Sequence, residues 1–212
     1  MSCGAHESQS RFFENYLGKR KAFIAKYFDY LKEVFPDELK DVSLDQFYKA
    51  ASAVKPTLIR IDADELTYPI HILIRYELEK KIFADDLDLD KLDEHWNKAY
   101  KDYLGLDVTS AATGILQDIH WSSGYFGYFP TYALGSAVGA QLLKTMEKDI
   151  DIDANLTGDI SKITSWLKEN FQKYGALYKL DDLLKISTGQ GFNPNYYIDY
   201  LIDKYTKLYN LD

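Results

Sequence analysis

Several features that mark familiar protein classes are missing from this sequence. It has a single cysteine, Cys3, so an internal disulfide framework cannot form. No run reaches the roughly 18 apolar residues of a membrane-spanning helix, and the N-terminus lacks the basic and apolar regions of a signal peptide. The net charge of -8 provides no basic excess for nucleic acid. We therefore expect a soluble, cytoplasmic protein that binds neither nucleic acid nor membrane.

One absence concerns metal chemistry. Many catalytic zinc sites use His-Glu-x-x-His, because a spacing of four places both imidazoles on one helix face. The chain has four histidines, at positions 6, 71, 95 and 120, and no two of them are four residues apart. His6 and Glu7 stand side by side near the start of the chain and could belong to a metal site. From the local sequence alone, a frayed first helical turn is the alternative.

Aromatic residues are abundant, at 15% of the chain, and 18 of them are tyrosines. A tyrosine packs like an apolar residue but keeps a polar hydroxyl at its tip. Such a composition is compatible with a wide, polar-lined groove as well as with half-buried helix faces.

Apolar residues recur every three or four positions over most of the chain, which predicts an all-α fold. The expected helices cover residues 7–35 (one helix, or two with a break near Gly18), 43–54, 67–83, 90–103, 130–148, 161–174, 180–186 and 193 to near the C-terminus. The stretch LIRIDAD, residues 58–64, instead alternates with a period of two. It predicts a short strand, and at most one small β-hairpin near residues 58–66. Without repeats or low-complexity linkers, residues 1–212 are expected to form a single domain.

The stretch IRIDADELTYPIHILIR groups side chains that are suited to binding an anion. His71 and Arg75 are four residues apart on a predicted helix, and Tyr68 lies three residues before His71. Arg60, on the predicted strand, could enter the same cleft and hold a carboxylate with two parallel hydrogen bonds. The alternative is structural: Arg75 pairs with Glu79 along the helix, and His71 is an ordinary half-buried histidine.

A second stretch, QDIHWSSGYFGYFPTYALG, combines glycines with aromatic residues ahead of a predicted helix. Tyr128 and Tyr132 are four residues apart, so both hydroxyls could face one groove, and His120 could add a hydrogen-bond donor. Glycine-aromatic loops also occur as plain packing elements. The local sequence does not decide between these two interpretations.

Four stretches together resemble one family, the thermostable zinc metallocarboxypeptidases of the Taq and Pfu carboxypeptidase type. They are HESQSRFFEN (6–15), IRIDADELTYPIHILIRYELE (59–79), QDIHWSSGYFGYFPTYALG (117–135) and TGQGFNPNYYIDYLIDKY (188–205). They occur in the family's order and at plausible spacing, and they span nearly the whole chain.

The resemblance implies an elongated helical domain with a deep substrate groove, cytoplasmic and commonly homodimeric. It implies a carboxypeptidase that releases residues from peptides with a free C-terminus, using zinc or, as a replacement, cobalt. In such enzymes two metal ligands and the general base come from His-Glu-x-x-His, and the third ligand is the Glu of His-Glu-Ser, here Glu7. Because His-Glu-x-x-His is missing, the chain looks like the C-terminal part of such an enzyme, with Met1 an internal methionine. We expect it to be inactive by itself.

The resemblance also suggests roles within the groove. Arg60 is the preferred clamp for the substrate carboxylate and Arg75 the second choice, with Tyr68 and His71 beside them. Zinc and nearby donors would stabilise the oxyanion. The candidates for those donors are His120, Tyr128 and Tyr132.

Two hypotheses follow. In the first, the chain is part of a metallocarboxypeptidase and works with the missing N-terminal half or as a homodimer. In the second, it is a non-catalytic helical fragment, either peptide-binding or the product of a truncated gene. In both cases helix faces that need cover would be exposed, so we expect the isolated chain to self-associate.

Overall fold

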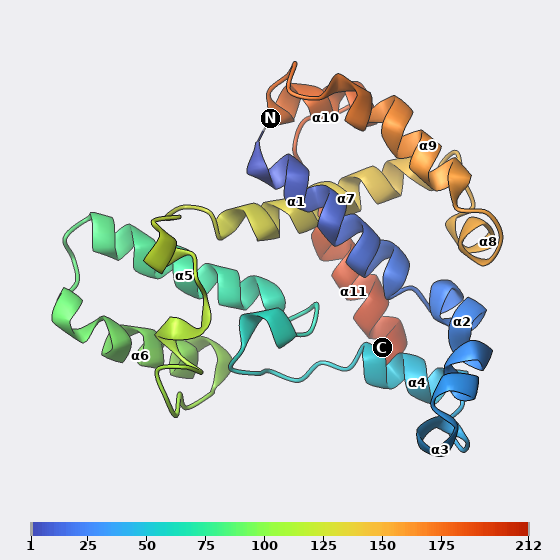
Figure 1. The fold of residues 1–212 in the computed structure, drawn as a ribbon. Helices are drawn as coiled ribbons and strands as arrows, with labels where there is room; N and C mark the ends of the chain where they lie inside the picture. The colour runs from blue at the N-terminus through green and yellow to red at the C-terminus, as the bar shows by residue number, and fades with distance from the viewer. Residues whose placement is uncertain (1, 212) are drawn as a thin grey trace. The chain divides into compact units, whose positions relative to one another are not determined.

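The computed structural model describes residues 2–211, and every regular element within that range is helical, which confirms the all-α prediction. The chain packs as two compact units (Figure 1). Unit 1 runs up to Ser52 and resumes at Leu134, whereas unit 2 covers Ala53–Ala133. Compact units of this kind occur within single domains as well as between domains. The expectation of a single domain therefore stays a prediction.

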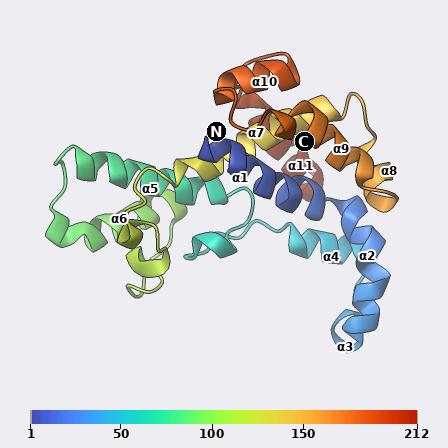
Figure 2. The same cartoon turned by 45° about the horizontal axis from the view of Figure 1, so that its top comes forward.

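Unit 1 contains the two ends of the described chain. Its elements are α1 (Cys3–Arg11), the π-helix η1 (Phe12–Gly18), α2 (Lys21–Val34), α3 (Pro36–Leu39), α4 (Leu44–Ala51), α7 (Pro130–Met146), α8 (Ile152–Thr157), α9 (Ser161–Asn170), η6 (Gln172–Tyr174), α10 (Leu180–Thr188) and α11 (Asn195–Tyr209). The first residues of α7 count with unit 2, because the boundary falls after Ala133. Helix α2 packs against α4 and α8 (Figure 2).

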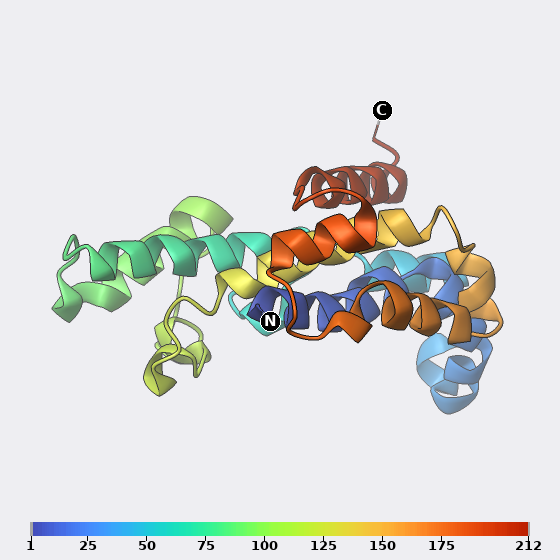
Figure 3. The same ribbon diagram turned by 90° about the horizontal axis from the view of Figure 1, so that it is seen from above.

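One continuous apolar cluster forms the core of unit 1. It joins buried side chains from α1, η1, α7, α8, α9, α10 and α11. Helix α7 lies between α1 and α11 in this unit (Figure 3) and is buried along most of its length. Since burial of apolar area is the main favourable term in folding, this cluster is the principal source of stability in unit 1.

Unit 2 is built around two neighbouring helices, α5 and α6, with irregular segments packed on them. Its elements are η2 (Arg60–Asp62), α5 (Tyr68–Phe83), η3 (Leu89–Lys91), α6 (Leu92–Leu104), η4 (Ile115–Gln117) and η5 (Trp121–Ser123). Its apolar core is divided into two small clusters, one around Tyr68 and Phe129 and one around Trp96 and Tyr100.

Several local sequence signals have the predicted effect. The helical segment at the N-terminus breaks near Gly18, where η1 ends and α2 begins three residues later. The helix predicted from residue 43 begins there, and Ser43 and Gln46 form a capping box at the start of α4. Gly105 ends α6 with a φ of 72°, a left-handed conformation that glycine adopts without steric cost.

The predicted strand over residues 58–64 is wrong. This segment forms the 3-10 turn η2, and no strand occurs in the described part of the chain. One contact and one exposure explain the difference. The backbone N–H of Arg60 donates to the side chain of Gln117 rather than to a neighbouring strand, and Ile61 is 73% exposed. So short an alternating stretch does not specify a strand against such a contact.

A search of the described helices for a stretch that is long and apolar enough to cross a membrane finds no candidate.

Candidate functional site

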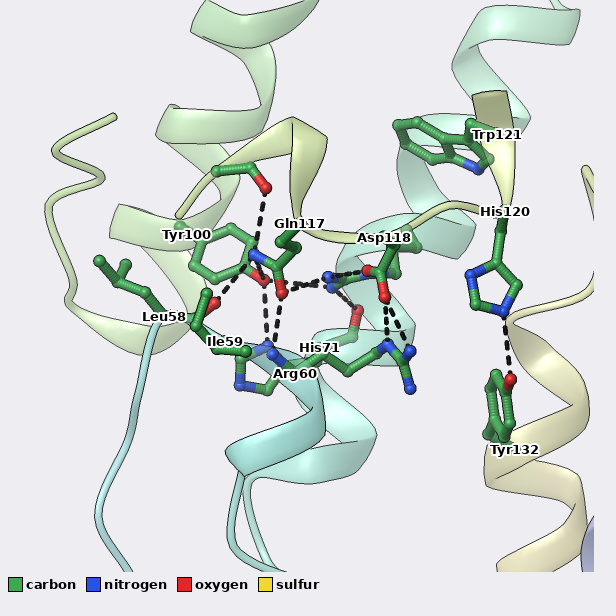
Figure 4. A network of polar contacts seen from close by, with 12 residues as sticks. Leu58, Ile59, Arg60, His71, Tyr100, Gln117, Asp118, His120, Trp121 and Tyr132 are labelled. Carbon is green, nitrogen blue, oxygen red and sulfur yellow. Dashed lines mark hydrogen bonds and ion pairs between the residues drawn. The ribbon is translucent and has the colours of Figure 1, made fainter. Parts of the chain in front are cut away.

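A carboxylate shared by two arginines forms the centre of the polar site in unit 2 (Figure 4). Asp118 Oδ1 accepts hydrogen bonds from Arg60 Nε at 3.0 Å and Nη2 at 2.7 Å. The other oxygen, Oδ2, accepts from Arg75 Nε at 2.8 Å and Nη2 at 2.6 Å. The Asp118 side chain is 8% exposed, so the three charges interact with little screening by solvent.

Helix α5 supplies much of this site because its polar residues recur at helical spacing. Tyr68, His71, Arg75 and Glu79 follow one another at intervals of three or four residues, and all four are buried. Residues spaced in this way share one face of a helix. The predicted convergence of Tyr68, His71 and Arg75 therefore has a geometric basis in α5.

Arg75 is fully buried, and each of its five N–H groups has an acceptor within unit 2. Nε and one N–H of Nη2 donate to Asp118, and the second N–H of Nη2 donates to Gln117 Oε1 at 3.0 Å. Nη1 donates to the His71 carbonyl at 2.8 Å and to the Tyr100 hydroxyl at 3.2 Å. No donor of Arg75 is left for a ligand.

Arg60 differs from Arg75 in this respect. It donates to Asp118 through Nε and Nη2, and to the Tyr68 hydroxyl through Nη1 at 2.9 Å. One N–H on each Nη has no acceptor among residues 2–211. The guanidinium lies over aromatic rings, with its carbon 5.0 Å from the ring centre of Tyr132 and 5.5 Å from that of Phe129.

Burial and neighbouring charges shift the pKa values of Asp118 and Arg60 in opposite directions. Burial alone would raise the pKa of Asp118, but the hydrogen bonds and positive charges of Arg60 and Arg75 lower it overall. Burial would likewise lower the pKa of Arg60, but the hydrogen bond to Asp118 and the interactions with Tyr68, Asp118 and Tyr132 together outweigh it and raise that pKa. Asp118 and Arg60 are therefore both ionised. Because arginine keeps its proton in proteins, the triad of Asp118, Arg60 and Arg75 has a net charge of one positive unit.

Gln117 connects the triad to the surrounding backbone. Its Oε1 accepts from the backbone N–H of Arg60 at 2.8 Å and from Arg75 Nη2 at 3.0 Å. Its Nε2 lies within hydrogen-bonding distance of the carbonyl oxygens of Leu58, Thr113 and Gly114. One side-chain amide thus joins η2 to the loop before Asp118.

His71 contacts its neighbour Tyr100. The Tyr100 hydroxyl oxygen accepts from Arg75 Nη1 at 3.2 Å, and it lies 3.0 Å from His71 Nδ1, within hydrogen-bonding distance. Burial, followed by the positive charges of Arg75 and Arg60, lowers the pKa of His71 from 6.5 to about 4. His71 is neutral at pH 7 and adds no charge to the site.

The three predicted oxyanion donors form an aromatic cluster in the same unit. His120 Nε2 lies 3.1 Å from the Tyr132 hydroxyl (Figure 4). The ring centre of Tyr128 lies 5.6 Å from that of His120 and 5.4 Å from that of Tyr132. Tyr132 also contacts the face of the Arg60 guanidinium, so this cluster adjoins the charged triad.

Glu79 fixes the loop that carries these aromatic residues. Its Oε1 accepts from Trp121 Nε1 at 2.6 Å, and its Oε2 accepts from the backbone N–H of Gly127 at 3.0 Å. The expected alternative pairing of Arg75 with Glu79 is therefore wrong, because Arg75 pairs with Asp118 and Glu79 binds the loop. His71 is also more deeply buried than that alternative assumed.

Glu7, the predicted metal ligand, lies on α1 in unit 1. Its helix approaches α7 at Gly135 so closely that a Cβ there would lie 2.7 Å from the Glu7 carbonyl carbon. Ser10 Oγ donates to Glu7 Oε2 at 2.9 Å. Between residues 2 and 211, no group of three His, Cys, Asp or Glu side chains is arranged to hold a metal ion. The described residues therefore do not by themselves fit a zinc site.

A cavity of about 790 Å³ lies elsewhere in unit 1, bordered by charged side chains and by Asn15, Tyr16, Tyr196 and Tyr200. It contains none of the residues that the sequence singled out for a functional role. Its rim is lined by ion pairs, among them Arg20 with Asp153.

The structure brings seven of the eight predicted site residues into unit 2, and only Glu7 lies in unit 1. Sequence reasoning missed Asp118, Gln117 and Tyr100. The first two stand directly before the Ile-His pair of a stretch already selected, and two nearby arginines needed an acidic partner. Tyr100 had no comparable signal, because its place on α6 marks it only as an apolar core position.

The chain is similar in sequence and in fold to proteins of known family. A profile of the family described as carboxypeptidase Taq (M32) metallopeptidase matches residues 1–205. Carboxypeptidase 1 of Bacillus subtilis is 47% identical over 212 residues, and thermostable carboxypeptidase 1 of Thermus thermophilus is 38% identical over 211. A crystal structure of an M32 carboxypeptidase from Deinococcus radiodurans superposes with a TM-score of 0.93 at 38% identity, covering 99% of this chain and 43% of that one.

These relatives are more than twice as long as this chain. The matches cover 99% of the present sequence, but only 42% of the Bacillus subtilis protein and 41% of the Thermus thermophilus protein. The activity of the longer proteins is therefore only a hypothesis for this chain.

Proposed function

Because the chain belongs to the carboxypeptidase Taq (M32) metallopeptidase family, we propose that it is the substrate-recognition part of a metallocarboxypeptidase. In this role it binds the free C-terminal carboxylate of a peptide and contributes to the release of the last residue. Catalysis requires further chain, equivalent to the part of the relatives that lies outside the match.

The observation that carries the proposal is the state of Arg60. A buried guanidinium that keeps one N–H on each Nη, next to a triad of net positive charge, provides what a carboxylate needs for two charge-assisted hydrogen bonds. An internal peptide bond has no carboxylate, so such a site selects chain ends. Arg75, with every N–H committed, supports Arg60 and does not contact substrate in this proposal. Tyr68 positions Arg60 through Nη1, and His71, which is neutral at pH 7, adds no competing charge.

The chemistry at the scissile bond is assigned to two other groups. His120, with Tyr132 hydrogen-bonded to it and Tyr128 against its ring, provides donors for the developing oxyanion. Glu7 contributes one carboxylate ligand to a divalent ion, with zinc and cobalt the proposed metals, and the remaining ligands come from further chain. We derive no step through the metal, since the described residues do not complete its site.

The proposed partners follow from the same reasoning. A complementary segment supplies the missing ligands and general base, and a homodimer is the expected assembly of the complete enzyme. We also retain the cytoplasm as its proposed location.

The test is reconstitution. The chain is co-expressed with the portion of Bacillus subtilis carboxypeptidase 1 that lies outside the 42% match, and amino-acid release is followed with zinc, with cobalt and with a chelator. We expect metal-dependent release from a peptide with a free C-terminus, and none from the same peptide with a C-terminal amide. Glu7→Ala should abolish release, whereas Arg60→Ala should mainly raise KM.

One control variant and a separate measurement of peptide binding distinguish substrate recognition from catalysis. Arg20→Ala removes a charge from unit 1 and should leave release unchanged. If the two parts form a complex that binds peptide but releases nothing under any metal condition, a non-catalytic peptide-binding role replaces the enzymatic one. Equal release from the amidated peptide would refute the carboxylate site itself.

A further inference from the structure

The charge balance around Arg60 depends on Asp118, which pairs with both Arg60 and Arg75. Asp118 contacts Arg60 on the edge formed by Nε and Nη2, and a pair of this kind is neutral overall. A peptide carboxylate approaching a neutral pair is attracted by the guanidinium and repelled by the nearby carboxylate. A simple Arg60–Asp118 pair would therefore orient the arginine but weaken its attraction for a second anion.

The second arginine removes this weakness. Arg75 takes the other oxygen of Asp118 with contacts as short as those of Arg60, 2.6 and 2.8 Å against 2.7 and 3.0 Å. Asp118 is thus shared equally between two cations, and the triad regains one positive charge. Neutral His71 adds no charge to the triad, and Glu79 is hydrogen-bonded to the loop rather than to either arginine.

Geometry also separates the functions of the two arginines. Arg75 is completely buried and has no donor left, so it cannot contact a ligand directly. Arg60 retains two N–H groups. The ring of Phe129 lies against both guanidiniums, 5.5 Å from the carbon of Arg60 and 5.1 Å from that of Arg75, and shields both from water.

We propose that Arg75 is a positioning residue for carboxylate recognition. It pairs with the second oxygen of Asp118, so that Asp118 orients Arg60 without neutralising its charge. This inference deepens the proposed function and rests on it. Asp118 and Arg75 both act through Arg60 in this inference. The charge at position 75 should therefore control the preference for a free carboxylate over an amide, although the peptide contacts Arg60 and not Arg75.

The experiment compares two ligands that differ only at the C-terminus. A short labelled peptide with a free carboxylate and its C-terminal amide are titrated against the chain, and anisotropy gives the ratio of the two affinities. For the unchanged chain we expect a preference for the free acid of roughly tenfold or more, the size of a charge-assisted contact. Arg75→Gln should bring this ratio close to one. Arg75→Lys, which restores the charge without the planar fork, should recover part of it.

A double variant makes the test independent of simple damage to the fold. Asp118→Asn combined with Arg75→Gln removes one charge of each sign and again leaves Arg60 with an uncompensated charge. The ratio should rise above that of Arg75→Gln alone. Arg20→Gln, which removes an arginine from an ion pair in unit 1, is the matched control and should leave the ratio unchanged.

Each outcome decides between the possibilities. A merely structural role for Arg75 would weaken both peptides to the same degree and leave the ratio intact, and this would overturn the inference. A double variant that fails to recover the ratio would also overturn it. If the unchanged chain shows no preference for the free acid, the proposed carboxylate site fails and this inference fails with it.

Discussion

The two units of this chain are stabilised in different ways. Unit 1 has one continuous apolar cluster to which seven helical elements contribute, and α1 approaches α7 closely at a glycine. Unit 2 has two small apolar clusters, and between them lies a buried network of two arginines, an aspartate, a glutamine and a tyrosine. Apolar burial is non-directional, whereas buried charges require every partner to be in place. Unit 2 holds most of the candidate site. We therefore expect a single polar substitution to lower the free energy of unfolding more in unit 2 than in unit 1.

The largest effect is expected at the shared carboxylate. Asp118→Asn leaves two buried guanidiniums without a counter-charge, and breaking a buried ion pair in this way costs about 3–5 kcal/mol. Unfolding of unit 2 can be followed by Trp96 and Trp121 fluorescence in a Trp166→Phe background, because Trp166 is the one tryptophan of unit 1.

The control for that prediction is an exposed acid in the same unit. Asp102 pairs with Lys98 along α6 at 2.6 Å, with both side chains more than half exposed, so Asp102→Asn should cost no more than about 1 kcal/mol. Similar losses for the two variants would mean that unit 2 does not depend on its buried charges.

Acid should weaken the network through His71. The unfolded histidine binds a proton below pH 6.5, but the folded one stays neutral until about pH 4. The folded state is therefore favoured above pH 6.5, and this contribution is lost as the pH falls from 6.5 to 4, up to about 3 kcal/mol. His71→Asn keeps a hydrogen-bonding partner for the Tyr100 hydroxyl and should flatten the pH dependence of the unfolding free energy in this window.

His95→Asn is the comparison for this experiment, since His95 lies partly exposed on α6 in the same unit. It should retain the slope of the unchanged chain. A slope that persists in His71→Asn would assign the acid sensitivity to other groups.

A smaller effect is expected in unit 1, where shape matters more than charge. A methyl group at Gly135 would lie 2.7 Å from a backbone carbon of Glu7, so Gly135→Ala forces α1 and α7 apart and should cost about 1–3 kcal/mol. At Gly4, also helical and buried, the nearest side-chain atom is 3.4 Å from the added methyl. Gly4→Ala should therefore raise stability by up to about 1 kcal/mol. Equal effects in denaturant titrations would contradict the close approach at Gly135.

The sequence was sufficient for most of the helices, because their signals are local, but it missed the short helices α3 and α8. The periodicity of α5, the capping box at Ser43 and the left-handed Gly105 each depend on residues within a few positions of one another. The convergence of Tyr68, His71 and Arg75 followed from the same periodicity.

The sequence was not sufficient where long-range contacts decide the conformation. Arg60 lies 57 positions from Gln117 and 58 from Asp118, and no local pattern indicates that these side chains meet. The error at the predicted strand has the same origin, since Gln117 takes the backbone hydrogen bond that a neighbouring strand would have taken. Tyr100 was missed because the hydrophobic spacing of α6 predicts that its ring is buried but gives no indication of what its hydroxyl contacts.

Among the backbone amides of unit 2 that donate to side chains, two bind residues far away in the sequence that belong to or border the candidate site. The amide of Arg60 donates to Gln117, and the amide of Gly127 donates to Glu79. An amide hydrogen exchanges with deuterated solvent only when its bond opens. The exchange of the Arg60 amide therefore reports the opening of the polar network, and that of the Gly127 amide reports the release of the loop from Glu79. Both are separate from the fraying of α5 and α6, and both would slow on peptide binding even if no helix moved.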